Sequence, residues 1–207
     1  MSHKSSSSRR WLKEHFSDPY VKQAHQDGLR SRAVFKLDEI QQRDQLFRAG
    51  MTVIDLGAAP GSWSERLMQW VGKKGKVIAL DILPMGPIAG VKFIQGDFQE
   101  GPCIQQLLQD IEQTKIDWVI SDIAPNLSGI ACVDQARSIG LAELVLDFAL
   151  KVLRPPSGLL IKVFQGAGSQ ELLSQIRAHF SKVVIRKPKA SRGRSREIYI
   201  LAKMLSP

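Results

Sequence analysis

The sequence has few of the residues that build disulfide or zinc scaffolds. Its two cysteines, Cys103 and Cys132, lie far apart and have no second pair, which excludes a disulfide framework and a four-cysteine zinc site. The four histidines include no pair with the spacing of metal ligands. We therefore expect no bound metal.

Long apolar runs are also absent. No stretch approaches the roughly 20 apolar residues that a membrane-spanning helix needs. The basic, serine-rich residues 1–10 are not followed by the apolar segment of a secretory signal. We expect a cytoplasmic protein with a flexible basic arm at residues 1–10 and a single domain over residues 11–207.

The charge is concentrated at the two ends. The whole chain carries 29 Lys and Arg against 20 Asp and Glu, a net charge of +9. Residues 1–36 and 182–203 hold the basic surplus, while the chain between them is mildly acidic. Two basic segments beside an acidic body indicate a polyanionic partner, because Lys and Arg bind phosphates whatever the sequence of the nucleic acid.

Between these ends, short aliphatic runs alternate with helical patterns. Ser31 is the expected N-cap of a helix whose apolar positions are Val34, Leu37 and Ile40. The expected strands are residues 52–56, 76–80, 91–94, 118–121, 159–164, 183–185 and 198–202. The expected further helices are residues 64–71, 101–113, 135–153 and 169–180. This alternation predicts an α/β, Rossmann-like fold with a mostly parallel seven-stranded sheet and helices on both faces. Only a short loop precedes the last strand, which we expect to return antiparallel.

The first strand runs into a glycine-containing turn, residues 55–63. Gly57 and Gly61 allow the backbone to approach a ligand before the next helix. Ala59 replaces the second glycine of the dinucleotide fingerprint, and the lysine of a P-loop is missing. The turn therefore predicts a nucleoside ligand without a pyrophosphate.

Carboxylates follow the next two strands. Asp81 stands where an acidic residue commonly accepts hydrogen bonds from ribose hydroxyls. Asp97 stands where a carboxylate can accept from an adenine amine. Alone, each is more often a turn residue, but together with the glycine turn they predict an adenosine site.

Six segments carry a family resemblance: residues 55–63, 81–85, 96–98, 121–126, 162–166 and 191–197. They resemble the FtsJ/RrmJ family of S-adenosylmethionine-dependent ribosomal RNA 2′-O-methyltransferases, and the likeness extends over nearly the whole chain. The resemblance implies a methyltransferase domain whose four catalytic residues are Lys36, Asp122, Lys162 and Glu197.

The resemblance also implies the binding residues and the partners. The implied contacts to S-adenosylmethionine fall on Gly61, Trp63, Asp81, Asp97 and Asp122. We expect the indole of Trp63 to fold over the cofactor. The implied substrate is a uridine in the A loop of 23S ribosomal RNA, presented on the 50S subunit to a monomeric enzyme. For RNA contacts the basic ends offer Arg32, Lys36, Arg192 and Arg194.

The residues support this chemistry, but the charges expected around Lys162 act in opposite directions on its protonation. A ribose hydroxyl must lose its proton as it accepts a methyl group, and Lys162 is the candidate base. An ordinary lysine is almost fully protonated at pH 7. Lys36 favours a neutral Lys162 through like-charge repulsion, whereas Asp122 and Glu197 favour the ammonium.

Two alternatives remain open at this point. The same four residues could methylate a ribose in another RNA, such as a tRNA or a messenger cap. The chain could instead be a ribosome assembly factor that binds RNA without catalysis, although the complete set of four charged residues argues against this.

Overall fold

The computed structural model describes residues 17–112, 114–126 and 128–205, so the arm expected at residues 1–10 lies outside the described residues. The elements form one seven-stranded sheet in the order β3-β2-β1-β4-β5-β7-β6. The strands are β1 (Thr52–Leu56), β2 (Lys76–Asp81), β3 (Val91–Gln95), β4 (Ile116–Ser121), β5 (Leu153–Phe164), β6 (Phe180–Arg186) and β7 (Glu197–Leu205).

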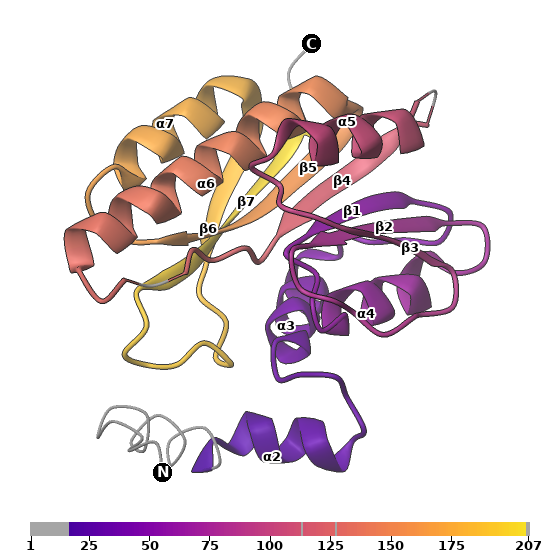
Figure 1. Cartoon of the computed structure of the whole chain (residues 1–207), viewed down its shortest axis with the longest axis horizontal. Helices are drawn as coiled ribbons and strands as arrows, with labels where there is room; N and C mark the ends of the chain where they lie inside the picture. The colour runs from indigo at the N-terminus through magenta and orange to yellow at the C-terminus, as the bar shows by residue number, and fades with distance from the viewer. Residues whose placement is uncertain (1–16, 113, 127, 206–207) are drawn as a thin grey trace.

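Helices cover both faces of the sheet, as the alternating pattern predicts. The helices are α2 (Pro19–Gln26), α3 (Val34–Asp44), α4 (Ser62–Val71), α5 (Gly101–Asp110), α6 (Ala131–Val152) and α7 (Ser169–His179). Figure 1 shows α5, α6 and α7 on one face and α3 and α4 on the other. In the described part of the chain, no helix combines the length and the apolar character that a bilayer span requires.

The predicted mixture of parallel and antiparallel strands is confirmed. The pairs β1 with β2, β1 with β4, β2 with β3 and β4 with β5 are parallel. Strand β7 lies antiparallel between β5 and β6. The loop from β6 to β7 contains no helix, so the chain has no crossover with which to return parallel.

Alternating side chains on the central strands build two apolar cores. In β1, Ile54 and Leu56 join the core under α5, α6 and α7, while Val53 joins the core under α3 and α4. Strand β5 begins at Leu153, six residues earlier than predicted, because its first residues include two prolines that make the sequence read as a loop.

The N-terminal helices differ from the sequence expectation. The N-cap of α3 is Ala33 instead of Ser31, and it makes no side-chain capping bond. The Ser31 hydroxyl instead accepts from the Ala33 amide at 3.2 Å and lies 2.8 Å from the hydroxyl of Ser62, which forms a turn before the helix. Helix α2 was not predicted, since it has only eight residues and Ala24 is its one buried residue.

The most unusual core residue is Asp55, a fully buried carboxyl group on β1. One of its oxygens accepts from the Ser64 hydroxyl at 2.6 Å, and the other has no hydrogen-bond partner. Burial raises the pKa of Asp55 to about 7, although the Ser64 hydrogen bond opposes the shift. The neighbouring Asp122 and Asp81 charges raise it further. Asp55 is therefore partly protonated near neutral pH.

This raised pKa predicts a pH-dependent stability. The pKa of Asp55 is about 7 in the folded state, against the ordinary value of 3.8 in the unfolded state. The folded state therefore holds the Asp55 proton more tightly than the unfolded state does. The contribution of Asp55 to the unfolding free energy therefore falls as pH rises from about 4 to 7, and then stays level. We expect Asp55→Asn, which resembles the protonated form, to be more stable than the unmodified protein above pH 7 by about 2–4 kcal/mol.

Urea denaturation at pH 4.5, 6 and 8.5 checks this expectation. The difference between the two proteins cancels the titration of groups they share. A difference that stays constant across this range would contradict the raised pKa.

Candidate active site

The site lies between β1 and β4, where the strand order of the sheet reverses. Strands β1 and β4 are neighbours, yet the chain leaves β1 toward β2 and returns to β4 on the other side. Ligands of such sheets bind at the carboxyl ends of these two strands. The Asp122 amide donates to the Leu56 carbonyl at 3.1 Å, which joins the two strand ends directly.

The glycine turn after β1 has no room for side chains. Gly57 has a φ of 78°, and a Cβ there would lie 2.7 Å from the Ile123 side chain. Gly61 has a φ of 100°, and a Cβ there would lie 2.7 Å from Met85. Both positions therefore require glycine, and they keep the backbone open to a ligand at the start of α4.

Asp81 joins this turn to the end of β2. One of its carboxylate oxygens accepts from the Ala59 amide and the other from the Leu83 amide, both at 2.8 Å. Each oxygen has a second lone pair, and Leu83 beside it is 60% exposed. The carboxylate is thus held in place, and its oxygens can still accept hydrogen bonds from ligand hydroxyls. The exposed side chain of Leu83 provides an apolar surface beside it.

Asp97 lies one strand further along the same edge. The Gly96 amide donates to the Asp81 carbonyl at 2.9 Å, which brings the ends of β2 and β3 together. One Asp97 oxygen accepts from the Gln99 amide at 2.8 Å, so the residue also stabilises its own turn. Gly61, Asp81 and Asp97 therefore follow the edge in the order expected of an adenosine site.

Trp63 differs from its expected placement. Its indole is 3% exposed, donates to the Ala33 carbonyl at 2.7 Å and packs against Tyr199 with ring centres 5.8 Å apart. The ring sits in the first turn of α4 facing α3 and the sheet, so burial and a partner for its N–H decide its position. The expectation that it folds over the cofactor is wrong, and a contact through its backbone is what remains for it.

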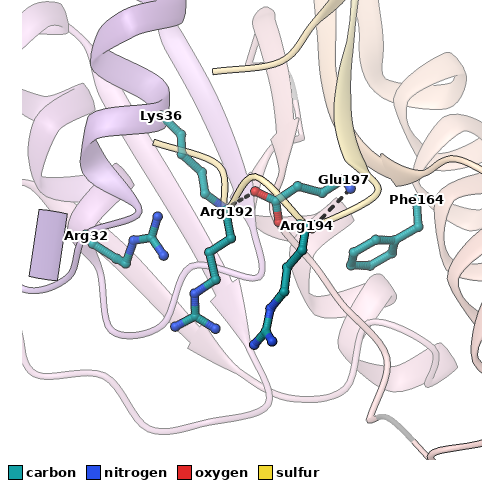
Figure 2. A pocket seen from close by; sticks show the side chains of 7 residues that line it. Arg32, Lys36, Phe164, Arg192, Arg194 and Glu197 are labelled. Carbon is teal, nitrogen blue, oxygen red and sulfur yellow. Dashed lines mark hydrogen bonds and ion pairs between the residues drawn. The ribbon is translucent and has the colours of Figure 1, made fainter. Parts of the chain in front are cut away.

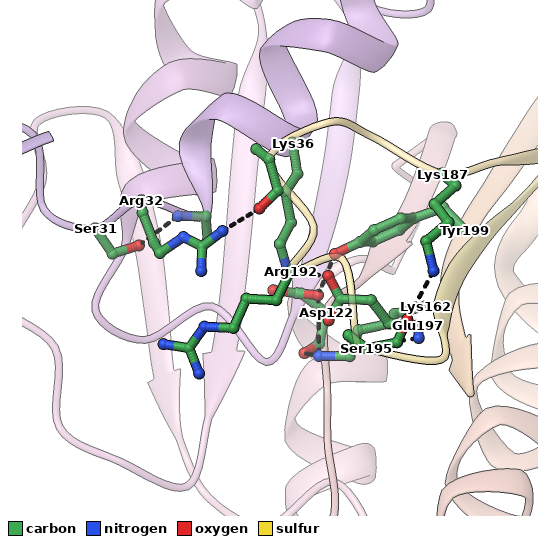
Figure 3. A network of polar contacts seen from close by, with 12 residues as sticks. Ser31, Arg32, Lys36, Asp122, Lys162, Lys187, Arg192, Ser195, Glu197 and Tyr199 are labelled. Carbon is green, nitrogen blue, oxygen red and sulfur yellow. Dashed lines mark hydrogen bonds and ion pairs between the residues drawn. The ribbon is translucent and has the colours of Figure 1, made fainter. Parts of the chain in front are cut away.

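The four catalytic candidates form two ion pairs at the ends of β4, β5, β7 and α3 (Figure 3). Lys162 Nζ lies 3.0 Å from a carboxylate oxygen of Asp122. Lys36 Nζ lies 2.8 Å from a carboxylate oxygen of Glu197. Lys162 also donates to the Asp122 backbone carbonyl, so Asp122 holds that ammonium with two oxygens.

Electrostatics keep both acids ionised. Burial raises the pKa of Asp122, but the Lys162 and Lys36 charges outweigh it and the net pKa is lowered. Burial likewise raises the pKa of Glu197, and the charge and hydrogen bond of Lys36 lower it below its usual value. The two acids and two lysines therefore compensate one another in a partly buried site.

Tyr199 is a site residue that the sequence interpretation missed. It is fully buried, and its hydroxyl donates to the Asp122 carboxylate at 2.7 Å. Burial raises its pKa well above the usual value and the Asp122 charge adds to this, so it remains a donor. A signal was present in the sequence, because Tyr199 lies two residues after Glu197 and so shares its face of β7.

Basic side chains surround the entrance (Figure 2). A cavity of about 450 Å³ opens beside the ion pairs. Its lining residues are Arg32, Lys36, Phe164, Arg192, Arg194, Ser195 and Glu197. The N-terminal and C-terminal basic segments therefore meet at this site, as their charge pattern suggests.

Arg32 also has a structural contact. Its guanidinium pairs with Asp18 at 2.6 Å and donates to the Ala190 carbonyl. Arg192 lies 3.8 Å from the same Asp18 carboxylate. These contacts tie the start of α2 to the loop between β6 and β7. Among the residues that the structure describes, no group of three or more His, Cys, Asp or Glu could hold a metal ion.

Comparison with known proteins agrees with this architecture. The family model described as FtsJ-like methyltransferase matches residues 29–205. Ribosomal RNA large subunit methyltransferase E of Stutzerimonas stutzeri is 54% identical over 200 residues, which cover 97% of each chain. A crystal structure named as a ribosomal RNA methyltransferase of Plasmodium falciparum superposes with a TM-score of 0.76 at 26% identity, and the match covers 85% of this chain and 98% of that one. This chain belongs to the FtsJ-like methyltransferase family.

Proposed function

We propose that this methyltransferase transfers a methyl group from S-adenosylmethionine to a ribose 2′-hydroxyl of 23S ribosomal RNA in the 50S subunit. The observation that carries the proposal is the pair of lysine–carboxylate contacts beside the glycine turn, at the mouth of a basic cavity. The substrate named for the Stutzerimonas relative supports the RNA class. The uridine of the A loop rests on the family resemblance. A 23S RNA substrate would place this enzyme in the cytoplasm. We further propose that it acts as a monomer and that residues 11–207 form one catalytic domain.

The residues at the glycine turn fit S-adenosylmethionine. Asp81 offers two fixed carboxylate oxygens to its ribose hydroxyls, and Asp97 offers an acceptor to its adenine amine. The backbone at Gly57 and Gly61 can approach it, because glycine has no Cβ that would hold a ligand away. When bound, the cofactor supplies an electrophilic methyl group on a sulfonium.

The four charged residues then act on the target hydroxyl. In its neutral form, Lys162 Nζ accepts the proton as the oxygen takes the methyl group. Asp122 orients that nitrogen from 3.0 Å, and Tyr199 orients Asp122. Lys36, held by Glu197, faces the same cavity and can hold the hydroxyl or the adjoining phosphate.

This division of roles predicts opposite defects in two variants. Lys162→Ala should lose methyl transfer by at least about 100-fold with little change in cofactor affinity, since the lysine acts on the hydroxyl. Asp81→Ala should weaken cofactor binding and leave the particle affinity unchanged. Radiolabel transfer to 50S subunits from a strain lacking the enzyme, and calorimetry with S-adenosylmethionine, measure the two effects.

Lys162→Arg provides the control for charge alone. A guanidinium keeps the positive charge and cannot release its proton at accessible pH, so this variant should also be inactive. Full activity in Lys162→Ala would refute the assignment of the base. Transfer to tRNA or capped RNA in place of the particle would favour the first alternative, and no transfer to any RNA would favour a binding factor.

The basic entrance predicts the salt dependence of RNA binding. Arg194 lines the cavity and is exposed, so Arg194→Gln should lower the slope of log affinity against log salt by about one unit. Arg177→Gln, an exposed arginine on α7, is the matched control and should leave the slope unchanged. An unaltered slope in Arg194→Gln would mean that RNA docks elsewhere.

A further inference from the structure

A second cavity adjoins the catalytic one. It has a volume of about 350 Å³ and shares Phe164, Arg194 and Ser195 with the first cavity. Its other lining residues are Gly129, Ala131, Asp134, Gln135 and Arg196. The cavity thus extends from the catalytic entrance to the first turn of α6, and none of the catalytic roles described above uses it.

The boundary between the two cavities is the aromatic ring of Phe164, which Figure 2 shows beside Glu197 and Arg194. Phe164 follows Lys162 by two residues on β5 and is paired in register with Glu197 on β7. Side chains two apart on a strand share a face, so the ring lies on the catalytic face of the sheet. It is only partly buried, which leaves aromatic surface available for a ligand.

Hydrogen bonds fix the backbone that carries this ring. The Gln135 amide group is buried and donates to the carbonyls of Phe164 at 3.0 Å and Ala167 at 3.1 Å. The backbone amide of Gln165 donates to the backbone carbonyl of Arg196 at 2.9 Å. A Cβ at Gly166 would lie 2.8 Å from the Gln135 amide, so the turn after β5 packs tightly on that side chain. The backbone that carries the ring is therefore held in place before an RNA binds.

The far wall of the second cavity indicates what it can hold. Gly129 and Ala131 line it without any polar side-chain atom. Asp134 keeps its negative charge, because hydrogen bonds from Ser128 lower its pKa. Because Asp134 offsets one of the two arginines, the second cavity is less basic than the first, and the ring of Phe164 offers a face on which a flat base can stack. The arginines on the near side can hold the connecting phosphate.

We propose that the second cavity binds the base of the nucleotide next to the target, stacked on Phe164. This rests on the proposed function, because the target ribose occupies the first cavity. The two nucleotides then lie on either side of one ring, so the RNA presents at least two consecutive unpaired nucleotides to the enzyme. Stacking tolerates any base, and the cavity therefore selects an unpaired strand more than a sequence.

Filling the cavity tests the proposal without changing Phe164. Ala131→Phe places a ring in the second cavity, and Cys132→Phe places the same ring on the next residue, which is exposed and does not line the cavity. With unmethylated 50S subunits as substrate, we expect Ala131→Phe to raise the KM for the particle by about 10-fold. Cys132→Phe should match the unmodified enzyme, and calorimetry should show the same cofactor affinity in both.

Substitution of the ring separates stacking from simple packing. Phe164→Leu keeps apolar bulk but removes the aromatic face, and we expect its particle KM to rise about 10-fold with a smaller change in kcat. Phe164→Tyr should restore binding. A purely structural role predicts instead that Phe164→Leu also weakens cofactor binding in calorimetry, whereas a stacking role leaves cofactor affinity unchanged.

The outcomes separate this proposal from the proposed function. If the unmodified enzyme methylates the particle and neither Ala131→Phe nor Phe164→Leu raises KM, the second cavity binds no base and the proposal is overturned. If the unmodified enzyme fails to methylate the particle, the proposed function itself is wrong.

Discussion

The arrangement of the four catalytic candidates depends on the antiparallel pairing of β7 with β5. This pairing sets Lys162 opposite Tyr199 and Phe164 opposite Glu197, so residues more than 30 positions apart share one face of the sheet. A shift of one residue would turn Glu197 and Tyr199 to the opposite face. The register is fixed by the strand itself, since Ile198, Ile200 and Ala202 alternate with the site residues and are buried in the core under α6 and α7.

The same pairing explains how two lysines remain in a partly buried site. Each ammonium faces a carboxylate, and the acids have lowered pKa values through these partners. The contact that positions the Lys162 amine also compensates the Asp122 charge, so neither of these buried groups is left without a partner of opposite charge.

Much of this site could be predicted because strand ends are visible in a sequence. Asp81, Asp97 and Asp122 each follow an aliphatic run, and parallel strands bring such ends to one edge. The missed features depend on contacts between distant segments. The position of the Trp63 ring is set by the Ala33 carbonyl, the Ser31 turn by Ser62, and the burial of Asp55 by strands on both sides of β1. Helix α2 buries only Ala24, and its N-cap Asp18 links it to Arg32. Periodicity does not reveal such contacts.

The loop between β6 and β7 connects RNA approach to catalysis. It carries Arg192 and Arg194 to the entrance, and β7 begins directly after it with Glu197. Helix α3 holds the start of this loop, because the Lys189 backbone amide donates to Glu39 at 2.7 Å and Arg186, at the end of β6, pairs with Asp44 at 2.6 Å. Helix α3 also supplies Lys36, which pairs with Glu197. The loop that carries the entrance arginines and the helix that carries Lys36 are therefore packed against each other beside the Lys36–Glu197 pair.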